Sequence, residues 1–479
     1  MPHIANHTKG LPGEILVRIF DCFTTHVELE ERLHQASEVD STPDYKTLSH
    51  ITKASRQFSR LAQPALYQLL VLHERASCAL LFRTLLSRPK IGHLVRGLSI
   101  HVYDDEFDPE TDTVLRSHLK AFRGKQPGVR TPLPVPESAD AQLAMFLAFL
   151  PQVETLDVML DDKQGLSSDF LTILPYWRGV VEQYLDLRSG AGTKIPLQSA
   201  IHSHFPALRQ VRLRHWRLLN KTPRLQYAAE LLSLPTLESL HCHWTNLSLI
   251  PEQISQFAPE ASPLALKDIF LENSSIDATS LECILSKCAN IRSLTISWGE
   301  EQVSDFKLNY RQLGTILRKH CGTLETLVLN PTKSRPLHEA GDDACIGPLR
   351  ALSKLRQLAI DSNALLGHSQ YLGTNDQTLQ DMLPASLEAL HLSFPIGAVK
   401  TGEKALYQLL TSAGMSLPSL RQASVDDRNV RFRKDFEALG WARTGLREVG
   451  SEMPYHSGCF YPMLLRDRAP EATAASHGA

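Results

Sequence analysis

The sequence has almost no net charge and no long apolar run, and each lack argues against a class of partner. Its 479 residues include 50 Lys and Arg and 52 Asp and Glu, which gives a formal charge of −2 at pH 7. This balance supplies no positive field that would hold a polyanion, so we expect neither nucleic acid nor a membrane as a partner. Residues 1–9 lack the apolar core of a signal peptide, and no run of 18 residues elsewhere is free of charge.

The chain also lacks the short motifs of nucleotide binding and of nucleophilic catalysis. Neither Gly-x-Gly-x-x-Gly, Gly-x-x-x-x-Gly-Lys-Ser/Thr nor Gly-x-Ser-x-Gly occurs in it. Its 8 cysteines are scattered, most of them within apolar patterns, which is typical of reduced thiols in the cytoplasm or nucleus. The sequence therefore predicts an intracellular protein that binds other molecules, with no enzymatic activity and no cofactor.

Two local groups contain possible metal ligands. His241 and His243 flank Cys242 and would lie on the same side of a strand, and Cys283 and Cys288 are five residues apart near a helix. Either pair supplies part of a zinc site, but neither supplies four ligands at a recognised spacing. We therefore expect no metal.

A helical pattern opens the chain. Its apolar residues recur at the three- and four-residue spacing of one helix face, at Leu11, Ile15, Leu16, Ile19, Phe20 and Phe23. Pro12 and Glu14 suit a first helical turn, which needs no N–H donor there and favours negative charge. The segment predicts a short amphipathic helix.

A second periodic run predicts another helix, with Leu48, Ile51 and Phe58 on its apolar face, ending at Gln63-Pro64. Residues 65–67 predict the start of a third short helix. The connection at 24–46 is rich in Asp and Glu, so we interpret it as a solvated insert. Three helices of this size bury little apolar surface, and we expect one face to remain for another chain or domain.

The order of these residues resembles the F-box. The matching stretches are Leu-Pro-x-Glu-Ile-Leu-x-x-Ile-Phe from Leu11 to Phe20, the helix with Arg56-Gln57-Phe58-Ser59-Arg60-Leu61-Ala62, and Pro64-Ala65-Leu66-Tyr67. The resemblance implies docking onto a Skp-type linker protein, and through it onto a cullin. It implies these linker-binding residues: Leu11, Pro12, Ile15, Leu16, Ile19, Phe20, Leu48, Ile51 and Phe58. The alternative is an ordinary helical cap on the segment that follows.

After Leu72 a pattern apolar-x-x-apolar-x-apolar recurs. From Leu208 onward the copies begin about 25 to 33 residues apart, in the upper range of leucine-rich repeats, with helical patterns between them. The copies begin at Val95, Val153, Leu208, Leu237, Leu266, Ile291, Leu324, Leu355, Leu387, Leu420 and, more weakly, Leu446.

The residue after the first apolar position is charged in every copy, from Arg96 to Arg447, so we expect this position to face water. A dipeptide that ends in proline precedes several copies, as in Leu150-Pro151 and Leu234-Pro235, and would end the preceding helix.

The fold class that follows is α/β, with a three-helix F-box at 8–72 and an irregular leucine-rich-repeat solenoid of parallel strands and helical returns at 73–465. The copies before Leu208 are about twice as far apart, and a Gly- and Pro-rich stretch at 124–136 predicts a loop there. In this irregularity the chain resembles fungal-type F-box proteins with divergent leucine-rich repeats. We expect a disordered tail at 466–479.

Strand positions between and after the apolar ones should project from the open face of the sheet. They bring together cationic and aromatic side chains, the types that dominate binding hot spots, at Arg212, Arg214, His241, His243 and Trp298. We predict that a target protein binds there, with an acidic or phosphorylated segment as one option. The alternative is a solvated face of mixed residues.

Two functions remain open at this stage. The first is a substrate-receptor subunit of an SCF ubiquitin ligase, which docks the linker through the F-box and presents an unidentified target on the repeats. The second is a leucine-rich-repeat scaffold that acts outside ubiquitin transfer.

Overall fold

The computed structural model describes residues 13–21, 45–72, 75–100, 139–160, 205–215, 228–250, 263–297, 310–330, 345–366, 379–393, 406–411, 416–425, 441–448 and 460–466, with a few single residues between them. The chain divides into two compact units. Unit 1 comprises Met1–Trp216 and Leu225–Leu240, and unit 2 comprises Arg217–Arg224 and His241–Ala479. No helix in these described ranges is long and apolar enough to cross a membrane.

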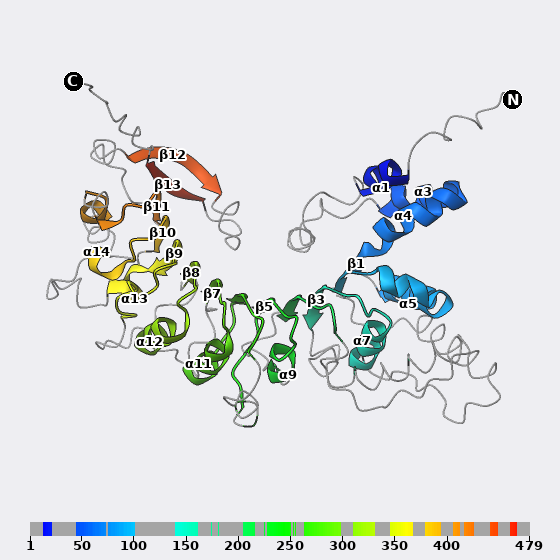
Figure 1. Cartoon of the computed structure of the whole chain (residues 1–479), viewed down its shortest axis with the longest axis horizontal. Helices are drawn as coiled ribbons and strands as arrows, with labels where there is room; N and C mark the ends of the chain where they lie inside the picture. Colours follow the sequence, from blue (N-terminus) through cyan, green and yellow to red (C-terminus); the bar gives the residue numbers. More distant parts are fainter. Residues whose placement is uncertain are drawn as a thin grey trace, which may run out of the picture. The chain divides into compact units, whose positions relative to one another are not determined.

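Unit 1 starts with helices and continues as a parallel sheet (Figure 1). Strands β1 to β4 pair in the order of the sequence, all parallel. The elements are α1 (Gly13–Asp21), α3 (Tyr45–Ala54), α4 (Arg56–Gln68), β1 (Leu69–Leu72), α5 (Arg75–Ser87), the 3-10 helix η2 (Pro89–Leu94), β2 (Gly97–Ile100), α7 (Ala139–Ala148), β3 (Thr155–Leu160), β4 (Gln210–His215) and α9 (Ala228–Leu232). Strand β5 (Ser239–His243) begins in unit 1 and ends in unit 2.

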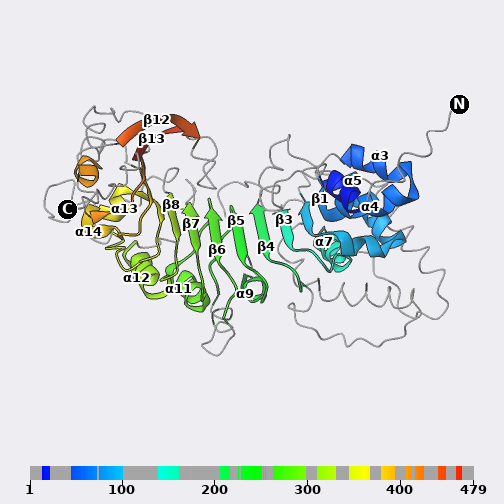
Figure 2. The same cartoon turned by 45° about the horizontal axis from the view of Figure 1, so that its top comes forward.

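In unit 2 the parallel strands β6 to β11 also pair in sequence order, and an antiparallel hairpin follows them. Figure 2 shows β6, β7 and β8 side by side, with α11 and α12 along one side of them. The elements are β6 (Asp268–Glu272), α11 (Ala278–Lys287), β7 (Ser293–Ser297), α12 (Tyr310–His320), β8 (Thr326–Asn330), β9 (Gln357–Asp361), α13 (Ser362–Leu366), α14 (Leu379–Met382), β10 (Ala389–Ser393), β11 (Gln422–Val425), β12 (Trp441–Glu448) and β13 (Phe460–Arg466).

The core of each unit is a stack of apolar residues that occupy the same position in successive strands. In unit 2, Leu294 lies opposite Leu327, and Leu327 lies opposite Leu358. All three side chains have no exposed surface. Each fully buried leucine contributes about 1.5–3 kcal/mol, and no single strand could bury its leucines without its neighbours.

The expected repeats are confirmed at ten strands, β2 to β11, each of which contains the second and third predicted apolar positions, while the first lies just before the strand. The dipeptides that end in proline before several strands also share a local structure. The residue before the proline is buried at Leu150, Leu234 and Leu417, and its carbonyl accepts the N–H three residues later. The turn that leads into each of these strands is therefore the same.

The charged residue of each repeat is exposed or half-buried in every described copy from Arg96 to Arg421, as predicted. Its backbone continues the ladder, because Glu154 N–H donates to Arg96 O at 2.7 Å and Arg209 N–H donates to Glu154 O at 2.8 Å. Two neighbouring pairs of opposite sign form ion pairs, at 3.0 Å for Arg96–Glu154 and 3.8 Å for Arg356–Glu388.

The predicted boundary between the second and third N-terminal helices is wrong. The break falls at Ser55, which has an extended backbone. Its hydroxyl caps α4 by accepting the Phe58 N–H at 3.0 Å. Helix α4 then continues through Pro64, because Ala62 and Ala65 on either side of this proline pack into the small helical core. The burial outweighs the hydrogen bond that proline cannot donate.

Two further predictions, one of a repeat and one of a domain boundary, need correction. Leu446 belongs to β12, which pairs only with β13 and runs antiparallel to it, so this last copy is not a repeat. Leu69–Leu72, assigned to the helical domain, forms β1 and starts the parallel sheet. The acidic insert before Tyr45, the loop at 124–136 and the tail after Arg466 lie outside the described residues.

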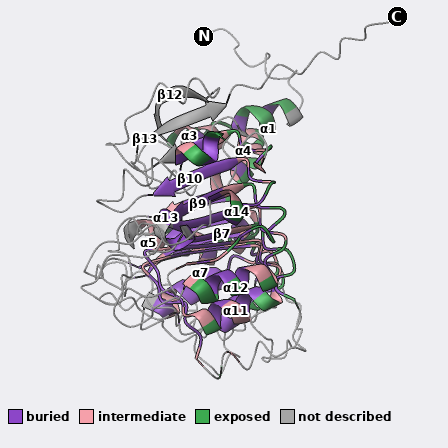
Figure 3. Cartoon of the chain, turned by 90° about the vertical axis from the view of Figure 1, so that its left-hand side faces the viewer, coloured by how far each residue is buried: buried purple, intermediate pink, exposed green. Residues whose placement is uncertain are grey.

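Helices α11 and α12 each bury apolar residues, Leu281 and Ile284 in α11 and Leu313 and Leu317 in α12, and both are partly purple in Figure 3. Within α12, Gly314 lies directly against the backbone of the following repeat. A Cβ atom at this position would stand 1.8 Å from the Ile346 carbonyl oxygen. Arg318 closes the same contact, because its guanidinium donates to the Ile346 carbonyl at 2.9 Å. A side chain at residue 314 would therefore force the two repeats apart.

We predict that Gly314→Ala lowers the stability of unit 2, even though alanine favours a helix by about 1 kcal/mol. Overpacking against a backbone carbonyl costs about 1–3 kcal/mol or more, since neither segment can move without breaking its ladder. Thermal unfolding followed by circular dichroism measures the effect. Gly322→Ala is the matched control, because nothing lies within 4 Å of the Cβ it would add. Equal melting temperatures for the two variants would contradict the prediction.

Candidate functional site

Helix α1 presents apolar side chains on two sides. Leu16 and Phe20 are buried in the helical core, where the Phe20 ring meets Phe58 edge-to-face at 5.9 Å. Ile15 and Ile19, one turn apart, are 44% and 42% exposed. Most large aliphatic side chains of the described chain are buried, so this face of α1 stands out as a place where another surface can bind.

The nine residues predicted to bind a linker therefore separate by position. Leu16, Phe20 and Leu48 form the core of the helical segment, with Ile51 and Phe58 packed against it. Ile15 and Ile19 face outward. Leu11 and Pro12 lie outside the described residues.

On the sheet of unit 1, Arg214 binds a buried carboxylate. Its Nε donates to Asp157 Oδ1 at 3.0 Å and its Nη2 to Asp157 Oδ2 at 2.5 Å, while the Ser99 hydroxyl donates to Oδ2 at 3.2 Å. The Asp157 side chain has no exposed surface and that of Arg214 is 14% exposed. Arg214 is therefore paired with a buried carboxylate of the neighbouring strand, while its proposed contact with a target stays a prediction.

Arg212 lies directly opposite Asp157 in the parallel register and is half-buried. The described strands β1 to β4 carry Asp157, Arg212 and Arg214 as their charged groups. His215 is neutral at pH 7, because burial lowers its pKa to about 4. These four described strands therefore carry an excess of one positive charge. Sequence reasoning missed Asp157, although it takes the same place in its repeat as Arg212.

In unit 2 the predicted histidines lie among aromatic and polar neighbours. His241 is buried, and the centroid of its ring lies 4.1 Å from the centroid of the Phe270 ring. The Nε2 atom of His243 is 3.2 Å from the Asn273 amide nitrogen, and its ring meets Trp244 at 5.9 Å. Both imidazoles are therefore held by this unit's own side chains. Trp298 lies outside the described residues.

Trp244 has a left-handed backbone, with φ 57°, at the start of the turn after β5. Asn273 has φ 46° at the equivalent place after β6, and there asparagine suits the conformation. Tryptophan has no such preference, and the conformation costs about 1–2 kcal/mol for an ordinary residue. The fold requires the left-handed turn at residue 244, but it does not require an indole there.

The open face of unit 2 is less solvated than the pattern suggested. In β4 exposure alternates strictly along the strand, but in β6 and β7 the three central residues are all buried. Thr295, Val328 and Ala359, which lie opposite one another in register, are each at most 5% exposed. Among the described residues of this face, the half-buried positions lie at strand ends, such as His243, Glu272 and Ser297.

Within the described ranges, no three His, Cys, Asp or Glu side chains gather closely enough to hold a metal ion. His241 and His243 are directed to different partners, as described above. No protein-family model matches the sequence, and a comparison with curated proteins finds no match either.

We predict that Arg214→Ala destabilises unit 1 by about 3–5 kcal/mol, because it leaves the Asp157 carboxylate buried without its partner. Urea unfolding followed by circular dichroism measures the loss. Arg212→Ala, on the same strand, should cost far less, since the Asp157–Arg214 pair remains. The double variant Asp157→Ala with Arg214→Ala should lose less than the sum of the two single variants. Additive losses would mean that the pair does not interact.

Proposed function

We propose that this protein is a substrate-receptor subunit of an SCF ubiquitin ligase. In this proposal α1 docks a Skp-type linker, and through it a cullin, while the repeat sheet presents a target protein. The observation that carries the proposal is the outward face of α1, where Ile15 and Ile19 stay exposed beside a buried Leu16 and Phe20. The F-box resemblance of residues 11–67 gives this face its proposed partner.

The packing of the helical segment suits such docking. Leu48, Ala62 and Ala65 hold α1 through Leu16 and Phe20, so the outward face belongs to a helix that is already in place. Covering the remaining exposed part of Ile15 and Ile19, 44% and 42% of each, contributes roughly 1 kcal/mol each to association, since burying a whole side chain contributes about 1.5–3 kcal/mol. The linker would then bind a prepared surface, which avoids the cost of ordering a flexible segment.

The repeat sheet supports the second half of the proposal. Units of one strand and one return segment, stacked in parallel, are the architecture of leucine-rich repeats, and these form extended binding surfaces. The proposed contribution to ubiquitin transfer is proximity. A receptor that holds a target lysine near a charged conjugating enzyme raises its effective concentration, without supplying a reacting group.

Among the predicted target-binding residues, Arg212 and His243 have the more accessible positions. Both are half-buried, whereas His241 is buried and Arg214 is bound to Asp157. Because Arg212 and Arg214 of β4 outnumber the one acidic side chain of the described strands β1 to β4, an acidic or phosphorylated target segment remains the proposed partner of Arg212.

We predict that Ile15→Glu combined with Ile19→Glu weakens linker binding at least about 100-fold, since two apolar contacts are replaced by charges that must be desolvated. Surface plasmon resonance with a purified Skp-type linker measures this. Leu80→Glu on α5 is the matched control, because Leu80 is 53% exposed and lies outside α1. If the unaltered chain binds no linker, the protein is better explained as a repeat scaffold outside ubiquitin transfer.

We further predict that Arg212→Glu lowers capture of cellular targets at least about tenfold, which corresponds to about 1.4 kcal/mol, while linker binding stays intact. Quantitative mass spectrometry of proteins co-purified with each variant measures capture. The control is Arg209→Glu, because Arg209 is exposed next to the same strand but occupies the charged ladder position. Equal capture by both variants would place recognition away from β4.

A further inference from the structure

Cys288 and Cys321 occupy the same place in two successive repeats of unit 2. Each directly follows the helix of its repeat, α11 or α12, and each precedes the first apolar strand position by three residues, at Ile291 and Leu324. Both thiols are free and buried, with 5% and 0% of their surface exposed.

The strand register brings the two cysteines close together. Ser293 pairs with Thr326, and counting back five residues from each leads to Cys288 and Cys321. The turns that contain them are also tied, since the Thr323 hydroxyl donates to the Ile291 carbonyl at 2.7 Å. Neighbouring parallel strands are about 4.8 Å apart, and a disulfide needs Cα atoms about 4.4–6.8 Å apart.

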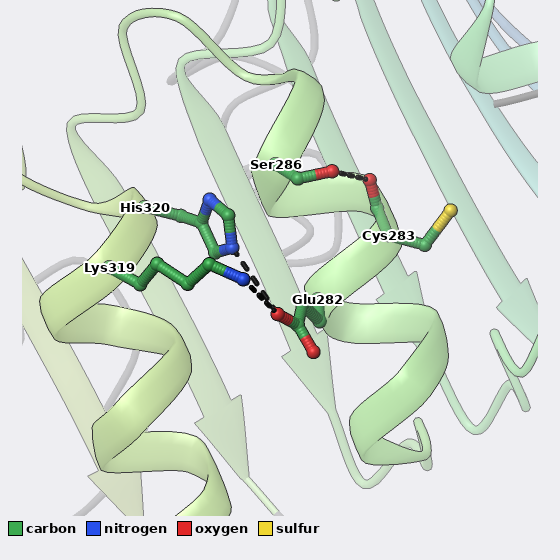
Figure 4. Close-up of polar contacts among 5 residues, drawn as sticks. All are labelled: Glu282, Cys283, Ser286, Lys319 and His320. Atoms are coloured by element: carbon green, nitrogen blue, oxygen red, sulfur yellow. Dashed lines mark hydrogen bonds and ion pairs between the residues drawn. The ribbon is translucent and has the colours of Figure 1, made fainter. Parts of the chain in front are cut away.

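Side chains next to the cysteines join the same two repeats. The Lys319 ammonium and the His320 imidazole, which directly precede Cys321, reach Glu282 of α11 at 2.9 Å and 3.4 Å (Figure 4). These hydrogen bonds, that of Lys319 first, hold the pKa of Glu282 below its usual value. The carboxylate therefore stays charged at pH 7, and α11 and α12 are held together beside the thiols.

We propose that Cys288 and Cys321 form a reversible intrachain disulfide under oxidation by a peroxide, which would cross-link two adjacent repeats of unit 2. The cross-link would fix the spacing of the repeats and oppose their separation. It goes beyond the proposed ligase function and does not depend on it.

The reaction balances with hydrogen peroxide as the oxidant. One thiolate attacks a peroxide oxygen, the O–O bond breaks, and a sulfenic acid and hydroxide form. The second thiolate attacks the sulfenic sulfur, the S–S bond forms and hydroxide leaves, so that two thiols and one peroxide yield one disulfide and two waters. A thiol reductant reverses the step by exchange.

Burial makes this reaction slow in the closed unit. It raises the pKa of both thiols to about 12, with the neighbouring Cys321 adding to the shift at Cys288. Since the thiolate is the reactive form, bond formation should accelerate as pH rises.

The test treats the full-length protein with hydrogen peroxide at pH 7 and pH 9, blocks the remaining thiols by alkylation, and maps disulfide-linked peptides by mass spectrometry. We expect a Cys288–Cys321 linked peptide that forms faster at pH 9 and disappears after dithiothreitol. We also expect a higher melting temperature for the oxidised protein, because the cross-link restricts the unfolded chain.

Cys288→Ala and Cys321→Ala should each abolish the linked peptide and the shift in melting temperature. Cys283→Ala is the matched control, since this half-buried thiol lies on the same α11 helix. Mapping the disulfide-linked peptides of the unaltered protein tests the proposal even if a variant fails to fold. Complete alkylation of both cysteines after treatment at pH 9, or linkage of either one to Cys283, would overturn the proposal.

Discussion

Each repeat of this fold depends on its strand's apolar residues, which stack against the residues at the same positions of the next strand. A single repeat has a short strand and a return segment, and it cannot bury its own leucines. The stack therefore imposes one register on all neighbours, as from Leu294 through Leu327 to Leu358. The close contact at Gly314 and the shared turn before several strands are consequences of this register, because both keep successive repeats at the strand spacing.

The register also decides which polar side chains meet. Asp157 and Arg214 come from strands far apart in sequence, yet the parallel pairing places them within hydrogen-bond distance, and burial makes their ion pair structural. Arg212, two residues away on the same strand, remains half-buried. Two arginines with the same pattern thus have different roles, because only one is needed to neutralise the buried carboxylate.

The packing of the N-terminal helices differs from that of the repeats. Their core is small, and α1 is held mainly through Leu16 and Phe20. The fold leaves 44% of Ile15 and 42% of Ile19 exposed, which makes them a candidate surface for association. The proposed linker docking rests on this imbalance, while the proposed target surface rests on the sheet, so the two halves of the function are independent.

The sequence by itself determined the repeats, since apolar spacing and the charged position after the first leucine depend on local periodicity and burial. It also predicted the helix α1, although the structure divides the apolar residues of this helix between a buried and an outward side. Only the tertiary structure decided that α4 continues through Pro64, that β12 and β13 run antiparallel, and that Arg214 is paired. These outcomes depend on contacts between distant residues, such as Asp157 with Arg214 and Phe20 with Phe58. Local periodicity does not encode such contacts, because a residue's own neighbours in sequence do not fix which distant side chain meets it.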